Sequence, residues 1–132
     1  MAINPSDAYR DRSTRHEARA RNYRRQADLL LERDNDSDCA GALLYESAKQ
    51  CINALANQRG QNPATTGGKV NVLRALAALE TDGRELIRCW QSSDKLHVHA
   101  DRGHLTDAEF HGYWDDAQSF IESMLSIYAR NA

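Results

Sequence analysis

The sequence predicts an all-α protein, an antiparallel bundle of about five helices. Only two prolines and seven glycines interrupt the 132 residues, which leaves long stretches free of helix breakers. Apolar residues recur at three- and four-residue spacing, and no segment of useful length alternates as a strand does. The length suits a single domain, residues 1–132, with residues 1–12 as a possible disordered arm.

The first two helices are expected at residues 6–33, or 14–33, and at 38–58. In the first, Ala20, Ala27 and Leu31 lie on one apolar stripe. The polar run 34–37 breaks this pattern and supplies an N-cap for the next helix. The second helix is apolar on two sides, so it either lies at the centre of the bundle or also serves a subunit interface.

Three further helices are expected after the irregular stretch 59–68. They cover residues 70–79, 84–99 and about 107–128. Thr106 and Glu109 have the spacing of a capping box, which fixes the start of the last helix. That helix has the clearest periodicity in the chain, and its aromatic residues are expected in the core: Phe110, Tyr113, Trp114 and Phe120.

Charge is distributed unevenly, although the net charge is only −2. Seven arginines lie between residues 10 and 25, whereas seven acidic residues lie between 94 and 122. Arg15, Arg21 and Arg25 fall opposite the apolar stripe of the first helix. We therefore expect these three arginines to contact nucleic acid. The alternatives are that they form a solvated or salt-bridged face, or that they contact a protein partner.

Composition also bears on the cellular setting. No apolar run approaches the length of a membrane-spanning helix, and no apolar core of a secretory signal follows Met1. The three cysteines cannot all pair within one chain. Reduced thiols in a cytoplasmic protein without a membrane span are the expectation.

One segment resembles a known family. Residues 90–99, Trp-Gln-Ser-Ser-Asp-Lys-Leu-His-Val-His, are similar to the W-x-x-A-x-x-L-H-x-N stretch of PaREP1-like proteins, a branch of the HEPN superfamily of helical domains. Ser93 replaces the alanine of that pattern, His99 replaces its asparagine, and residues 100–101 replace an aromatic pair. The small-residue second helix and the closing amphipathic helix extend the resemblance over most of the chain.

The resemblance implies a homodimeric domain that binds or cleaves RNA, in a toxin–antitoxin or defence setting, with an antitoxin or other protein as partner. Many proteins of this superfamily are metal-independent ribonucleases. Their signature is an arginine and a histidine four to six residues apart. That signature is missing here: no arginine stands at that spacing before His97 or His99, and the nearest is Arg88. Binding without catalysis therefore stays open.

The chemistry of RNA cleavage points to residues of the fourth helix. It needs proton transfer, which histidine performs near neutral pH, and a cation for the phosphate. Arg88, Lys95 and His99 fall on nearly one side of a continuous helix, whereas His97 falls with the apolar residues. If the domain is catalytic, His97 or His99 would transfer protons, and Arg88 and Lys95 would hold phosphate.

Three other interpretations compete. In the first, the fourth-helix residues are only solvated charges and a core histidine. In the second, the chain is a noncatalytic interaction module whose second helix mediates dimerisation. A small metal-binding protein using His99, His104 and His111 is the third, although their spacing matches no standard site. No metal or other cofactor is expected.

Overall fold

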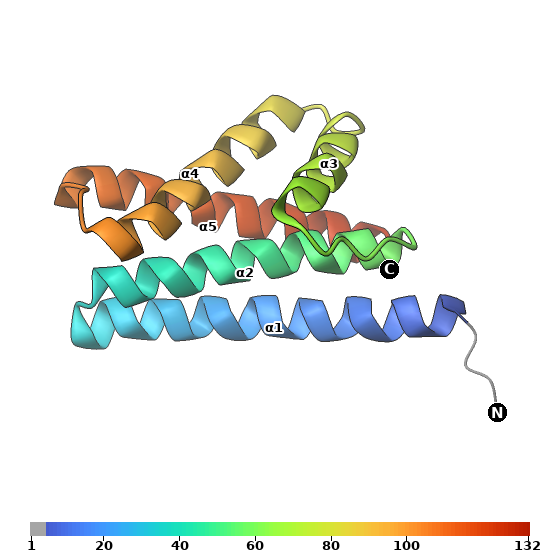
Figure 1. Cartoon of the computed structure of the whole chain (residues 1–132), viewed down its shortest axis with the longest axis horizontal. Helices are drawn as coiled ribbons and strands as arrows, with labels where there is room; N and C mark the ends of the chain where they lie inside the picture. The colour runs from blue at the N-terminus through green and yellow to red at the C-terminus, as the bar shows by residue number, and fades with distance from the viewer. Residues whose placement is uncertain (1–4) are drawn as a thin grey trace.

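The computed structural model describes residues 5–132, which form five α-helices and no strand. The helices are α1 (Pro5–Asp34), α2 (Ser37–Gln58), α3 (Thr66–Ala77), α4 (Gly83–Arg102) and α5 (Asp107–Arg130). Long helices that follow one another along the chain, α1 and α2 or α4 and α5, run in opposite directions (Figure 1). The predicted all-α antiparallel bundle of five helices is confirmed.

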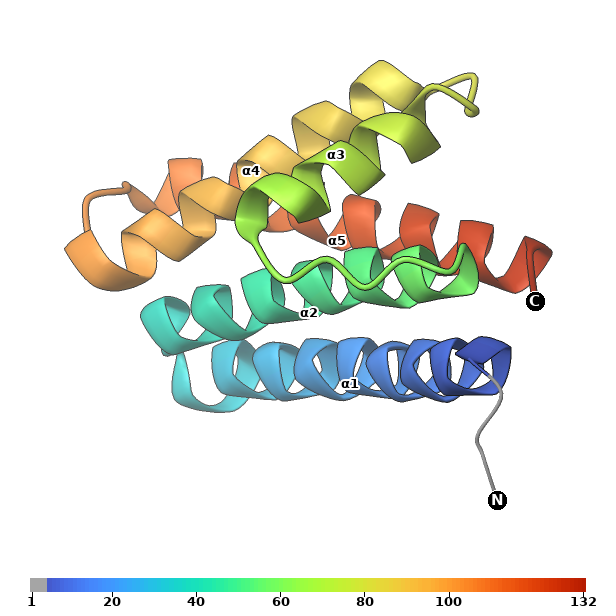
Figure 2. The ribbon, with the colours of Figure 1, turned by 45° about the vertical axis from the view of Figure 1, so that its right-hand side comes forward.

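Helix α2 lies at the centre of the molecule. It contacts all four other helices, and α1 covers one side of it while α3 and α4 lie on the other (Figures 1 and 2). Both of its apolar strips are consequently buried within the chain, including Tyr45, Ile52 and Ala56 of the second strip. This decides between the two expectations for α2. Its second strip packs in the monomer and is not a free surface for dimerisation.

The α1–α2 pair has the most extensive contact in the fold. Small residues allow the two helices to approach closely, since Ala20 and Ala27 are fully buried. Two serine hydroxyls then donate across the interface to main-chain carbonyls. Ser13 Oγ lies 2.8 Å from the oxygen of Ala54, and Ser47 Oγ lies 2.7 Å from that of Ala20. These bonds fix α1 in both register and rotation relative to α2.

Helix α1 begins earlier than one of the two expected starts. Residues 5–12 are helical and continuous with the rest of α1, so they are not a disordered arm. Residues 1–4 of that expected arm lie outside the described residues. Helix α3 begins at Thr66 rather than Val70, because the Thr65 hydroxyl caps it by accepting from the Gly68 amide.

The turns follow the local chemistry of the sequence. Asp36 caps α2 by accepting from the Cys39 amide, and the capping box of Thr106 and Glu109 is confirmed at the start of α5. At Gly83 a Cβ atom would lie 2.0 Å from the carbonyl oxygen of Ala77. Only glycine permits α4 to begin so close to the end of α3.

The core is made where α2, α4 and α5 meet. The fully buried large side chains include Leu44, Leu96 and Phe120. Of the aromatic residues expected there, Phe110, Trp114 and Phe120 are buried and Tyr113 packs partly buried against them. Within residues 5–132, no helix is both long and apolar enough to cross a membrane.

Candidate nucleic-acid interface

His99 is held inside the fold by both ring nitrogens. Its side chain is buried, Nδ1 accepts from the amide of Leu105 at 3.0 Å, and Nε2 lies 3.1 Å from a carboxylate oxygen of Asp38. An acceptor at Nδ1 places the proton of the neutral ring on Nε2, where it is donated to Asp38. The imidazole therefore ties the α4–α5 turn to the start of α2.

Arg88 is neutralised by acidic residues. Its guanidinium lies 2.5 Å from Glu85 of the preceding turn and 2.9 Å from Asp116 of α5. Asp116 also accepts from the Ser92 hydroxyl at 2.8 Å. The arginine and this hydroxyl hold the pKa of the Asp116 carboxyl below its usual value. A phosphate would have to displace these partners.

The other two residues of the expected catalytic group point elsewhere. His97 is exposed and stacks on the ring of Tyr45, with centroids 4.3 Å apart. Lys95 is exposed. Thus Arg88 faces α5, His99 faces α2 and the α4–α5 turn, and His97 faces Tyr45. The structure does not bring these side chains to one site.

The histidines expected to bind a metal also do not form a metal site in the described residues. Helix α4 continues to Arg102, so His99 lies within the helix and His104 lies in the turn after it. His99 and His104 have ring centroids 5.9 Å apart, but both nitrogens of His99 are engaged. Among residues 5–132, no group of three or more His, Cys, Asp or Glu side chains is placed to hold a metal ion.

The arginines of α1 divide into two flanks. On the flank toward α5, Arg24 donates to Gln118 at 2.6 Å and pairs with Glu122 at 2.7 Å. Arg21 pairs with Glu17 at 3.0 Å, and Arg25 donates to Asn22 at 2.8 Å. Arg21 and Arg25 are exposed as expected. Arg21 and Arg24 have carboxylate partners, whereas Arg25 bonds to a neutral amide.

The other flank is different, and we call it the arginine face: Arg12, Arg15, His16 and Arg19. These four residues and Asn62 line a hollow of about 280 Å³. Arg12 donates to the amide oxygen of Asn57 at 3.0 Å, and Arg15 and Arg19 are exposed. In the described part of the chain, no carboxylate forms an ion pair with any of the three arginines. The hollow therefore concentrates uncompensated positive charge.

His16 stands at the centre of the arginine face and was not among the expected site residues. Its Nδ1 lies 2.5 Å from Oε1 of Gln50, so Nδ1 donates and Nε2 is the acceptor of the neutral ring. Partial burial lowers the pKa of His16 below 6.5, and Arg19, Arg15 and Arg12 lower it further by repulsion. The ring is consequently neutral at neutral pH.

A spacing signal for this face was present in the sequence. Residues 12, 15, 16 and 19 stand three and four apart and so share one side of a helix. The arginine–histidine spacing of the HEPN signature also occurs here, at Arg10 and His16, with five residues between. The expectation that this signature is missing is therefore wrong for residues 10–16. Arg10 is highly exposed and lies 3.8 Å from Asp7.

The chain matches no protein-family model, no curated protein and no solved structure. The resemblance to the HEPN superfamily thus stays a prediction from the sequence, and the site has to be argued from its own geometry.

Proposed function

We propose that this chain binds RNA through the arginine face of α1. The observation that carries the proposal is the hollow lined by Arg12, Arg15 and Arg19, whose charges have no acidic partner within residues 5–132. Guanidinium groups bind phosphate oxygens well because their planar fork donates two hydrogen bonds at once. Spaced along a helix, they suit a polymer of phosphates.

Two further features suit a nucleic acid. Asn62 adds a side-chain amide to the hollow, and His16 adds a neutral ring nitrogen that can accept a hydrogen bond. A sugar hydroxyl or a base edge supplies a matching donor. The HEPN resemblance agrees with RNA as the class of nucleic acid.

The test compares the two flanks of α1. Fluorescence anisotropy would measure binding of a labelled single-stranded RNA of about 12 nucleotides, a length that covers typical single-strand sites. The variant Arg15→Glu/Arg19→Glu should weaken binding about 100-fold, because each lost charge-assisted contact costs at least about tenfold. Arg21→Glu/Arg25→Glu is the matched control, since it changes the net charge equally on the same helix.

The control variant should lose less than about tenfold in RNA affinity, because it changes only the general charge of the protein. Equal losses from both double variants would show that net charge, rather than the arginine face, governs binding. An absence of binding by the folded wild-type protein at low salt would overturn the proposal outright.

His16 supports metal-independent RNA cleavage as a second candidate function. Its lowered pKa leaves Nε2 free to take the proton of a 2′-hydroxyl, beside arginines that would stabilise the phosphate. The expected catalytic group on α4 lacks such an arrangement, because Arg88 and His99 are bonded within the fold.

Cleavage is tested with a mixed RNA pool in EDTA, comparing the wild type with His16→Ala, His97→Ala and His99→Ala. Loss of cleavage in His16→Ala alone, with binding retained, supports this candidate. Loss only in His97→Ala or His99→Ala, with that variant shown to be folded, would return the chemistry to α4. Uncut RNA with every protein folded would leave binding as the function.

The homodimer and an antitoxin or other protein partner remain predictions. If a dimer forms, it must use a surface other than the second strip of α2, which is buried in the chain. Light scattering at the concentrations of the binding assay would give the oligomeric state.

A further inference from the structure

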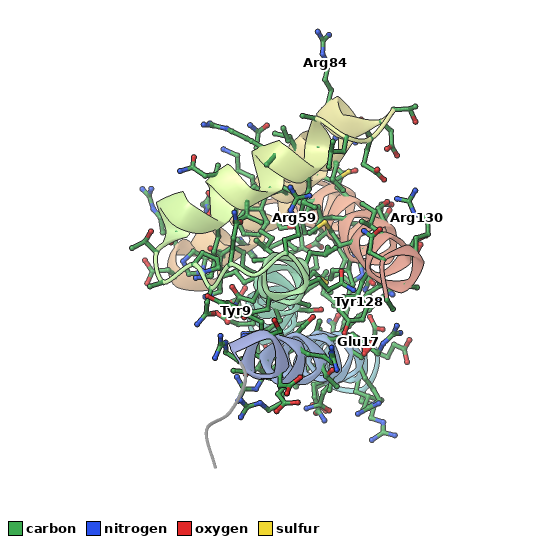
Figure 3. All side chains as sticks on the ribbon, turned by 90° about the vertical axis from the view of Figure 1, so that its right-hand side faces the viewer. Tyr9, Glu17, Arg59, Arg84, Tyr128 and Arg130 are labelled. Atoms are coloured by element: carbon green, nitrogen blue, oxygen red, sulfur yellow. The ribbon has the colours of Figure 1, made fainter. Side chains whose placement is uncertain are left out.

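A second hollow opens at the end of the bundle where α1 begins and where α2 and α5 end. Its volume is about 490 Å³, which is enough for a small organic ligand. Figure 3 looks onto this end of the molecule and labels Tyr9 on α1 and Tyr128 on α5. We call it the end cavity, and the residues that matter in its lining are Tyr9, Arg10, Ser13, Asn57, Gln58 and Tyr128.

Two aromatic side chains line the end cavity from different helices. Tyr9 is partly buried, and the Arg12 guanidinium lies 4.6 Å from the centre of its ring. Tyr128 is partly buried too, with its hydroxyl 3.5 Å from Oγ of Ser13. Aromatic walls of this kind favour a flat ligand that can stack.

The polar groups of the cavity indicate which flat ligand fits. Gln58 donates through Nε2 to the Tyr128 carbonyl at 3.0 Å, but its buried Oε1 receives no hydrogen bond in the described part of the chain. A ligand N–H would satisfy that oxygen if the amide turned toward the cavity and gave up its bond to Tyr128. Arg10 adds a positive charge, which the exposed carboxylate of Asp7 contacts only at 3.8 Å, and no Asp or Glu is among the described lining residues. The ligand therefore combines a ring, an N–H donor and a negative charge.

Asn57 connects the end cavity with the arginine face. Its side chain lines the cavity, its Oδ1 accepts from Arg12 at 3.0 Å, and its Nδ2 lies 3.3 Å from Oδ1 of Asn62. Arg12 and Asn62 in turn line the hollow of the arginine face. A strand whose phosphates cross that hollow passes directly beside the cavity.

We propose that the end cavity holds one unpaired base of the RNA strand whose backbone lies on the arginine face. This inference rests on the proposed function and adds to it a substrate class: RNA with at least one unpaired nucleotide. Tyr9 and Tyr128 provide stacking surfaces, Gln58 meets the base edge, and Arg10 contacts an adjacent phosphate.

The experiment compares single-stranded RNA of about 12 nucleotides with a blunt duplex of the same length. The variants are Tyr9→Leu, Tyr9→Phe and, as a matched control, Tyr113→Leu, which removes a tyrosine of α5 outside the cavity lining. Tyr9→Leu should weaken single-strand binding at least about fivefold, because stacking of one base contributes that much. Tyr9→Phe keeps the ring and should bind nearly as the wild type does.

Duplex affinity and the salt dependence of binding should be the same in all four proteins. If single strand and duplex bind equally and Tyr9→Leu matches Tyr113→Leu, the base site is wrong, while sensitivity to Arg15→Glu/Arg19→Glu would still support the arginine face. If no RNA binds, both proposals fail. A third outcome is that the protein binds no RNA strand but its tyrosine NMR signals shift when adenosine 5′-monophosphate is added. That result would assign the cavity to a free nucleotide and overturn its link to an RNA strand.

Discussion

Helices α1 and α4 both carry arginines beside histidines, yet the fold treats the two groups differently. On α4, Arg88 is paired with Glu85 and Asp116, and the buried His99 has both nitrogens bonded. On α1, the arginine face has no acidic partner within residues 5–132, and His16 keeps one ring nitrogen available. The resemblance of residues 90–99 to a known family made α4 the expected site. What distinguishes a binding site is charge that the fold leaves uncompensated.

The largest effect should come from removing a histidine that the fold uses. His99→Ala leaves the Leu105 amide without its acceptor and opens space in a buried position, so it should lower the free energy of unfolding by about 2–3 kcal/mol. His16→Ala should cost about 1 kcal/mol or less, since it loses one partly exposed hydrogen bond. Urea denaturation followed by circular dichroism measures both. If both variants lowered the free energy of unfolding by similar amounts, the histidines of α1 and α4 would not differ in their structural role.

An intermediate effect should appear in the salt dependence of RNA binding. Each phosphate contact contributes about −0.7 to the slope of log affinity against log salt for single strands. Arg15→Gln or Arg19→Gln should therefore make the slope shallower by about 0.7, whereas Arg88→Gln should leave it unchanged. Titrations between about 50 and 200 mM salt provide the measurement. A shallower slope in Arg88→Gln would place the RNA on α4 as well.

The smallest effect should be a pH dependence that belongs to His16. Its pKa lies below 6.5 in the free protein, so Nε2 accepts a hydrogen bond at neutral pH. At lower pH the protonated ring would donate to a phosphate instead, and the phosphates would then raise that pKa by favouring the charged ring. Proton uptake then accompanies binding, so RNA affinity should increase, by less than about tenfold, as pH falls from about 8 toward 5.5. His16→Gln should show no such increase.

The same group also affects stability, with a definite sign. Because folding lowers the pKa of His16, its neutral form is favoured in the native state. The contribution of His16 to the free energy of unfolding is therefore complete above pH 6.5, and it is lost as the pH falls through the pKa of His16 in the folded protein. Binding titrations at low pH should be accompanied by a check that the protein remains folded.

Most of the fold was predictable because helical periodicity and capping are local properties. The capping box at Thr106 and the apolar face of α5 depend only on near neighbours in the sequence. The start of α3 was missed because the Thr65 cap precedes glycines, which the propensity scale disfavours in helices. The site was less predictable. Its contacts depend on how α5 and α2 pack against α4. This packing brings Asp116 to Arg88 and Asp38 to His99.

The Asn35–Asp36 connection, with Asn35 at a φ of 51°, has a consequence for the order of folding. It is the shortest link between helices in the structure, and it joins the pair with the most extensive contact. Pairs joined by short connections pay little loop-closure entropy and tend to form first. We therefore expect α1 and α2 to associate early, before α4 and α5 close the core. A chain emerging from the ribosome would then present its cationic helix, already oriented, while the remaining helices were still being synthesised.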